Sequence, residues 1–110
     1  MPKIRVTPVA LNDLKEIKEY IADELSNPIA ANNVIKRIID DYSLLEVSPH
    51  MGTPLSSKIH IKTDFRFLLS GNYLVFYKAD KNYISIYRIL HGRRDYLKII
   101  FDDIDFEKAE

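Results

Sequence analysis

The sequence predicts an α+β domain in two layers, and three observations support this fold class. Apolar residues recur every three or four positions between residues 8 and 48, which indicates two amphipathic helices. Between residues 58 and 90, apolar residues alternate with polar ones, which is typical of strands. A chain of 110 residues has the size of one domain. We therefore expect an N-terminal strand and an antiparallel helical hairpin packed on one face of an antiparallel sheet.

The first half of the chain contains the expected first strand and both helices. Residues 3–6 alternate and predict a short strand, and Thr7-Pro8 predicts a capped helix start. Residues 26–28, Ser-Asn-Pro, predict the break between the helices, and Ser48-Pro49 the end of the second one. The short break predicts an antiparallel pair. The two apolar stripes consist of Leu11, Leu14, Ile17, Ile21 and Leu25, and of Ile35, Ile38, Ile39, Tyr42 and Leu45.

The second half predicts a meander of three strands, near residues 65–69, 73–79 and 83–90. Ile59 and Ile61 already follow the same alternation. Gly71-Asn72 predicts a two-residue type II′ hairpin turn, and residues 80–82 the second turn. The predicted order is β-α-α-β-β-β, with a candidate short helix over residues 94–101. The helices cover one face of the sheet and leave the other partly open. The domain is expected over residues 1–101, and residues 102–110 form an acidic C-terminal tail.

Composition excludes several classes of function. The chain has no cysteine, so it can form neither a disulfide nor a thiolate metal site. His50, His60 and His91 lack the spacing of metal ligands, and no nucleotide-binding glycine motif is present, so we expect no metal and no cofactor. No secretory leader and no apolar run long enough for a membrane span is visible, which leads us to expect a cytoplasmic protein without membrane contact.

The net charge of zero conceals a segregation of charge along the chain. Residues 58–101 contain nine basic and three acidic side chains, a net charge of +6. Residues 102–110 contain one basic and five acidic side chains, a net charge of −4. Such clustering is consistent either with ordinary solvated surface or with a basic face that binds an anionic partner.

The segment from Tyr83 to Tyr96, YISIYRILHGRRDY, contains an alternating strand followed by a glycine turn. The side chains after the strand include two guanidiniums, an imidazole and a phenol, which suit binding to a phosphate-rich partner. Arg88 is in phase with apolar neighbours, and a buried arginine needs an anion. Either an internal acid such as Asp40, Asp41 or Asp64 pairs with it, or it helps to bind a ligand. Tyrosines beside basic residues can stack on bases or simply fill the sheet. The candidate target-binding residues are Tyr77, Lys78, Tyr87, Arg88 and Arg93.

Cleavage of RNA through its 2′-hydroxyl requires proton transfer and a cation that stabilises the phosphorane. His91 or Tyr96 could transfer protons, and Arg66 and Arg94 could hold the phosphate. The candidate catalytic residues are therefore Arg66, His91, Arg94 and Tyr96, relevant only to a ribonuclease. In structural terms, Arg66 could instead be a solvated edge residue and His91 incidental, and one of Arg93 and Arg94 could pair with Asp95 or another acid.

The helical hairpin, the strand pair FRFLLSGNYLVFYKAD and above all IYRILHGRRDYLKII resemble the RelE/ParE superfamily of bacterial type II toxins. The resemblance covers roughly residues 2–101 and implies a small sheet packed on two helices. It also implies a cognate antitoxin as partner and a metal-independent mechanism in the ribonuclease branch. Leu74 stands where that branch has a strand arginine, and Ile100 where it has a catalytic tyrosine. The HGRRD ending is more similar to the ParE branch.

The resemblance therefore implies the toxin of a type II toxin–antitoxin system, which arrests bacterial growth through ParE-like inhibition of DNA gyrase. One alternative is a RelE-like, ribosome-dependent mRNA endonuclease (an mRNA interferase). Another is a non-toxic relative that only binds its antitoxin. The target would be gyrase in the first case and the ribosome with its mRNA in the second.

Overall fold

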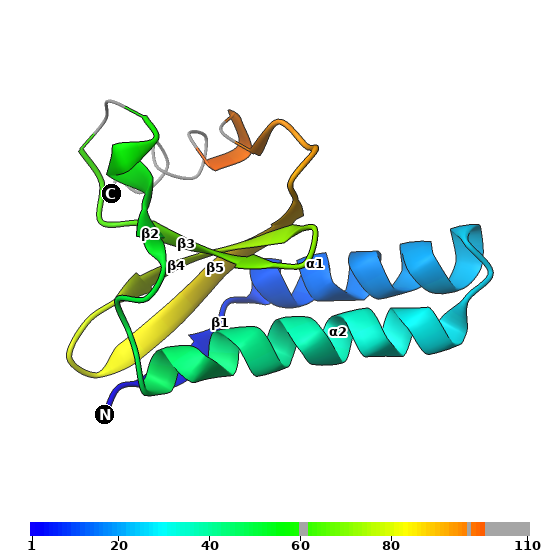
Figure 1. The fold of residues 1–110 in the computed structure, drawn as a ribbon, viewed down its shortest axis with the longest axis horizontal. Coiled ribbons are helices and arrows are strands. Elements are labelled where there is room, and N and C mark those ends of the chain that lie inside the picture. The colour runs from blue at the N-terminus through cyan, green and yellow to red at the C-terminus, as the bar shows by residue number, and fades with distance from the viewer. Residues whose placement is uncertain (60–61, 97, 101–110) are drawn as a thin grey trace.

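Five strands and two long helices form the part of the chain that the computed structural model describes, residues 1–59, 62–96 and 98–100. The elements are β1 (Lys3–Val6), α1 (Pro8–Glu19), α2 (Pro28–Ser43), β2 (Thr53–Pro54), β3 (Arg66–Ser70), β4 (Tyr73–Ala79) and β5 (Tyr83–His91). A π-helical turn (Tyr20–Glu24) follows α1, and 3₁₀ turns occupy Leu44–Glu46 and Leu55–Ser57. Figure 1 shows α1 and α2 side by side on one face of the sheet. The predicted α+β class and element order are confirmed.

The strands form one sheet in the order β1-β5-β4-β3-β2. Strands β3, β4 and β5 are the predicted antiparallel meander, and Gly71 at φ +58° lies in the turn between β3 and β4. The first strand joins the sheet at one edge, parallel to β5, with Lys3 opposite Tyr83. The chain between them contains the helical hairpin and strands β2 to β4, so it is long enough for the crossover that a parallel pair requires. Strand β2, which the sequence did not predict, is short and contains a proline, as an edge strand permits.

The helix boundaries follow the predicted capping residues. The Thr7 hydroxyl accepts from the Ala10 N–H, and the Asn27 amide oxygen accepts from the Ala30 N–H. The apolar stripe of the first helix is shorter than predicted, because Leu11 and Leu25 are 55% and 57% exposed. The π-helical turn adds a residue to one turn and thereby rotates Leu25 out of the stripe.

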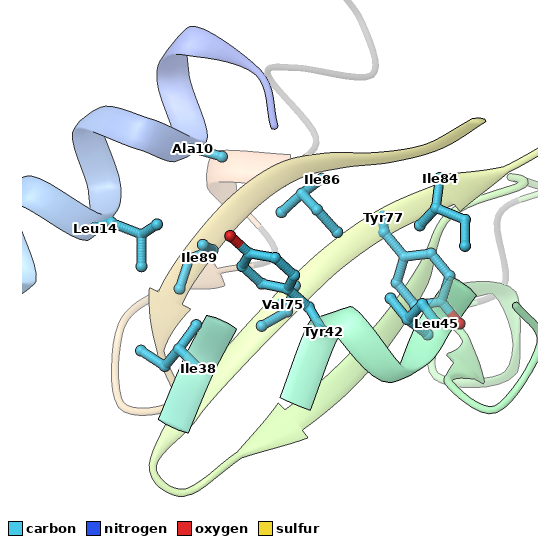
Figure 2. Close-up of a cluster of buried hydrophobic side chains, with 10 residues drawn as sticks. All are labelled: Ala10, Leu14, Ile38, Tyr42, Leu45, Val75, Tyr77, Ile84, Ile86 and Ile89. Atoms are coloured by element: carbon cyan, nitrogen blue, oxygen red, sulfur yellow. The ribbon is translucent and has the colours of Figure 1, made fainter. Parts of the chain in front are cut away.

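The main core lies between the helices and the sheet, and we call it the helix-side core (Figure 2). Leu14 from α1 and Ile38 and Tyr42 from α2 point toward the sheet, where they meet side chains of β4 and β5. In the second predicted stripe Ile39 is partly exposed, whereas Leu45 is fully buried. The buried members of the helix-side core are Ala10, Leu14, Ile38, Tyr42, Leu45, Val75, Tyr77, Ile84, Ile86 and Ile89.

A second apolar cluster covers the opposite face of the sheet, and we call it the outer core. Its buried members are Leu55, Ile59, Phe65, Leu74, Phe76, Leu90 and Ile100. The 3₁₀ turn before β3 and the segment after β5 lie over this face (Figure 1), so less of it is open than the sequence predicted. Tyr96 and residues 98–100 are helical, in agreement with the candidate short helix. Phe101 and the predicted acidic tail lie outside the described residues.

Candidate functional site at the end of β5

A β-bulge in β5 sets the direction of the side chains at the end of the strand. Phe76 of β4 pairs with Arg88, whereas the next residue, Tyr77, pairs with Ile86, so Tyr87 is an extra residue in β5. A bulge of this kind changes which face the following side chains point to. Ile84 and Ile86 pack in the helix-side core before the bulge, whereas after it Ile89 packs there and Leu90 packs in the outer core. The sequence-based alternation, which put Arg88 in phase with Ile86, therefore does not persist through the bulge.

Arg88 forms an ion pair inside the fold. Its Nε and Nη2 atoms donate to the two carboxylate oxygens of Asp13 at 2.9 and 3.0 Å. The side chains of Arg88 and Asp13 are only 16% and 5% exposed. Of the two predicted alternatives, the internal ion pair is the one observed, although its acid is Asp13. Asp41, one of the predicted partners, accepts instead from the Ser70 hydroxyl at 2.6 Å.

Asp13 also connects helix α1 to the edge of the sheet. Its Oδ2 atom accepts the backbone N–H of Ile89 at 2.9 Å. Strand β1 ends opposite Ile86, so it does not reach this part of the β5 edge. The carboxylate therefore provides a hydrogen bond where the neighbouring strand has ended, and it fixes the last residues of β5 against α1. The apolar stripe predicted for this helix does not include Asp13, so the sequence did not reveal its role.

The turn after β5 presents two arginines to solvent. The His91 carbonyl accepts from the Arg94 N–H at 3.0 Å, and the His91 Nδ1 atom accepts from the Arg93 N–H at 3.0 Å. The His91 ring lies edge-on to Tyr73, with ring centroids 5.2 Å apart. These contacts give the turn a defined conformation, while Arg93, Arg94 and Asp95 are exposed.

A cleft of about 440 Å³ lies beside this turn, and we call it the β5-end cleft. Its walls combine acidic side chains of α1 with basic and aromatic groups of the sheet. Burial raises the pKa of Tyr73, and Tyr20 raises it further, so its phenol remains a neutral hydrogen-bonding group at pH 7. The lining residues are Asp13, Glu16, Ile17, Tyr20, Tyr73, Ile89, Leu90, His91, Arg93 and Arg94.

Tyr77 does not agree with its predicted role in target binding. Its side chain is fully buried, and its hydroxyl donates to the Pro49 carbonyl and accepts from the Gly52 N–H. It therefore fixes the loop before β2. Arg66 contributes to the same loop, because its Nη1 atom donates to the carbonyls of His50 and Gly52 at 3.2 and 2.8 Å.

The remaining predicted residues lie in other surroundings. Lys78 and Tyr87 line a second hollow together with Arg66. Tyr96 packs on Phe76, with ring centroids 5.7 Å apart, as part of the outer core. Among the predicted catalytic residues, the β5-end cleft therefore brings together only His91 and Arg94. No group of three or more potential metal-ligating side chains occurs within the described residues.

Comparison with known proteins gives a family and a fold. A family model described as "ParE toxin of type II toxin-antitoxin system, parDE" matches residues 4–96. A solved structure described as a chromosomal ParDE TA system from P. aeruginosa is similar, with a TM-score of 0.70 and 20% sequence identity. The similarity covers 83% of this chain and 96% of that one. No curated protein matches this chain. In the described part of the chain, no helix is long and apolar enough to cross a membrane.

Proposed function

The chain belongs to the ParE toxin family of type II toxin–antitoxin systems, and we propose that it arrests bacterial growth by binding and inhibiting DNA gyrase in the cytoplasm. A cognate antitoxin neutralises it. The family match over residues 4–96 is the observation that carries this proposal.

The target-binding surface that we propose is the β5-end cleft with its two exposed arginines. Arginine is enriched among the residues that dominate binding energy in protein interfaces. Arg93 and Arg94 follow a strand end that Asp13 fixes and a turn that His91 orders. Because this backbone is already ordered, binding loses less conformational entropy there than at a flexible segment.

The arrangement of the candidate catalytic residues favours inhibition by binding over RNA cleavage. Arg66 holds the loop before β2, Tyr96 packs in the outer core, and His91 and Arg94 belong to the β5-end cleft. General acid–base chemistry requires its groups within hydrogen-bonding reach of one scissile bond. Dispersed groups of this kind suit contacts with a protein surface better.

The antitoxin is proposed to cover apolar side chains that the fold leaves exposed. Several large ones lie on the helices, the loops and the edge of the sheet, and apolar surface of this kind is typical of a protein-binding region. The most exposed examples on these elements are Leu11, Tyr20, Leu25, Ile29, Leu44, Val47 and Leu69. An acidic antitoxin segment would in addition offset the basic second half of the chain.

Expression in a bacterial host tests the toxin assignment. Growth should stop when the chain is produced alone and resume when the product of the neighbouring open reading frame is produced with it. Leu44→Glu combined with Val47→Glu should preserve the arrest and weaken the rescue. Normal growth with intact, correctly folded protein would contradict toxicity and favour a relative that only binds its antitoxin.

A supercoiling assay with purified gyrase tests the target. The protein should inhibit supercoiling, and the double change Arg93→Gln and Arg94→Gln should reduce inhibition at least about tenfold. The matched control is Lys36→Gln with Arg37→Gln, an adjacent basic pair on α2, which should inhibit like the parent. New mRNA ends on translating ribosomes with unaffected gyrase would reject the gyrase proposal in favour of RNA cleavage.

A further inference from the structure

The β5-end cleft has one wall from helix α1 and one from the ends of two strands (Figure 1). The helix wall consists of residues that recur every three or four positions and therefore share one face of α1 and its C-terminal end: Asp13, Glu16, Ile17 and Tyr20. The sheet wall begins with Tyr73, the first residue of β4, which pairs with His91 at the end of β5. Helix periodicity and strand register thus bring the two walls together.

Both walls present aromatic rings to the cleft. Tyr20 is 57% exposed, yet it lies close enough to Tyr73 to raise the pKa of the Tyr73 phenol. On the sheet wall, the His91 ring meets Tyr73 edge-on, which orients the Tyr73 side chain. Ile17 adds a half-buried aliphatic side chain on the helix wall. The middle of the cleft is therefore aromatic and aliphatic, and its largest ring is only partly covered.

The charges around the cleft favour an anionic partner. The Asp13 carboxylate is paired with Arg88, and Glu16 accepts from a neighbouring side-chain amide at 3.1 Å. Arg93 and Arg94 are exposed, and neither forms an ion pair within the described residues. These two guanidiniums and that of Arg88 stand against two carboxylates, so the net charge is +1. The two arginines of the turn carry the charge that a partner meets.

We propose that the β5-end cleft binds an acidic segment of the target protein through one aromatic side chain of that segment. This assignment rests on the proposed function, because it names the partner of the same surface. The ring would pack against Tyr20 and Tyr73, and flanking carboxylates would accept charge-assisted hydrogen bonds from Arg93 and Arg94. An apolar centre with a charged rim is the usual anatomy of a protein interface. The volume of about 440 Å³ is sufficient for one ring.

A short peptide with one tryptophan between aspartates is a direct probe of this surface. The chain itself contains no tryptophan, so tryptophan fluorescence reports on the peptide alone. Binding to the purified full-length chain should be saturable and should shift the emission to shorter wavelength, because the ring leaves water. In competition experiments, a peptide with alanine in place of tryptophan should bind at least about tenfold more weakly. A tryptophan peptide with lysines in place of the aspartates should not bind.

Two variants assign the contacts to individual side chains. Tyr20→Ala should weaken binding of the tryptophan peptide about tenfold and leave the alanine peptide unaffected, because only the first peptide loses a ring contact. Arg93→Gln with Arg94→Gln should weaken both peptides. The matched control is Tyr83→Ala, since Tyr83 is also exposed, at 41%, and does not line the cleft. It should bind both peptides like the parent, and melting temperatures close to that of the parent exclude misfolding.

Several results would overturn the assignment. These are no saturable binding up to about 1 mM protein, equal weakening of both peptides by Tyr20→Ala, and tighter binding of the lysine peptide, which would indicate a basic segment held by Glu16. The supercoiling assay separates the ligand from the proposed function. If the parent and Tyr20→Ala inhibit gyrase equally, the aromatic contact is rejected and gyrase inhibition stands. If the parent binds the peptide but does not inhibit gyrase, gyrase is rejected and the acidic aromatic ligand stands.

Discussion

Replacing Asp13 by asparagine should destabilise the fold more than any comparable change on the helix surface. The substitution keeps the shape of the side chain and removes its charge. Arg88 would then remain largely buried without its carboxylate, and Ile89 would lose a charged acceptor for its N–H. Removing one partner of a buried ion pair lowers the free energy of unfolding by about 3–5 kcal/mol. The amide oxygen of asparagine can still accept the Ile89 N–H, so we expect a loss of about 4 kcal/mol, essentially from the ion pair.

Urea denaturation followed by circular dichroism measures this loss. A domain of this size has a stability of about 5–15 kcal/mol, so the variant should unfold at a much lower urea concentration. The matched control is Asp40→Asn, an exposed carboxylate on α2, which should change stability by less than about 0.5 kcal/mol. A loss below about 1 kcal/mol for Asp13→Asn would refute the role of the ion pair.

A double variant separates the charge from the packing. Asp13→Leu with Arg88→Met replaces both charges by apolar groups, and such replacements of buried pairs are often neutral. It should recover much of the stability lost in Asp13→Asn. Leucine at position 13 offers no acceptor to the Ile89 N–H, so recovery should be incomplete by about 1–3 kcal/mol. A double variant no more stable than Asp13→Asn would show that the charges are not what the single change disturbs.

Three further predictions concern the loop before β2 and the β4–β5 turn. Gly52→Ala should cost more than about 2 kcal/mol in urea denaturation, because an added Cβ would lie 2.5 Å from the Tyr77 hydroxyl and 2.8 Å from the Phe67 carbonyl. Burial raises the pKa of Tyr77, so stability should fall as pH rises above about 10. Tyr77→Phe should be less stable than the parent at pH 7, because the Pro49 carbonyl and the Gly52 N–H lose their partner, and the deficit should shrink at alkaline pH. Asp80→Asn should be less stable at pH 7, with a deficit that disappears as pH falls below 3.8, since hydrogen bonds lower the pKa of this carboxyl in the fold.

Local patterns predicted most of the fold correctly because they are determined by neighbouring residues. The helix starts follow from a capping residue before proline, and the β3–β4 turn follows from Gly71-Asn72. The edge position of β1 could not be predicted in this way, because it depends on pairing with β5 across about 80 residues. The π-helical turn after α1 likewise has no composition signature, and it accounts for the exposed Leu25.

The candidate site was predicted less well, and the bulge in β5 is the main physical reason. A strict alternation of side chains assigns each residue of β5 to the correct face of the sheet up to Ile86. Beyond the extra residue Tyr87 it assigns them to the wrong face. Sequence reasoning recognised that Arg88 needs an acid, but it could not choose the acid, because Asp13 is 75 residues away. The exposed arginines were identifiable because they follow a strand and a glycine. Tyr77 was misjudged, since a neighbouring lysine does not reveal a buried hydroxyl.

The basic second half of the chain is therefore not one surface. Arg88 is paired within the fold, and Arg66 holds a loop. Arg5 lies opposite Ser85 near the β4–β5 turn, whereas Arg93 and Arg94 line the β5-end cleft. Six strand residues separate Ser85 from His91 at the end of β5, and at about 3.3 Å each they span roughly 20 Å. Substitutions this far apart without shared partners act additively, so Arg5→Gln should leave gyrase inhibition unchanged. Loss of inhibition in Arg5→Gln would mean that one extended partner contacts both ends of β5.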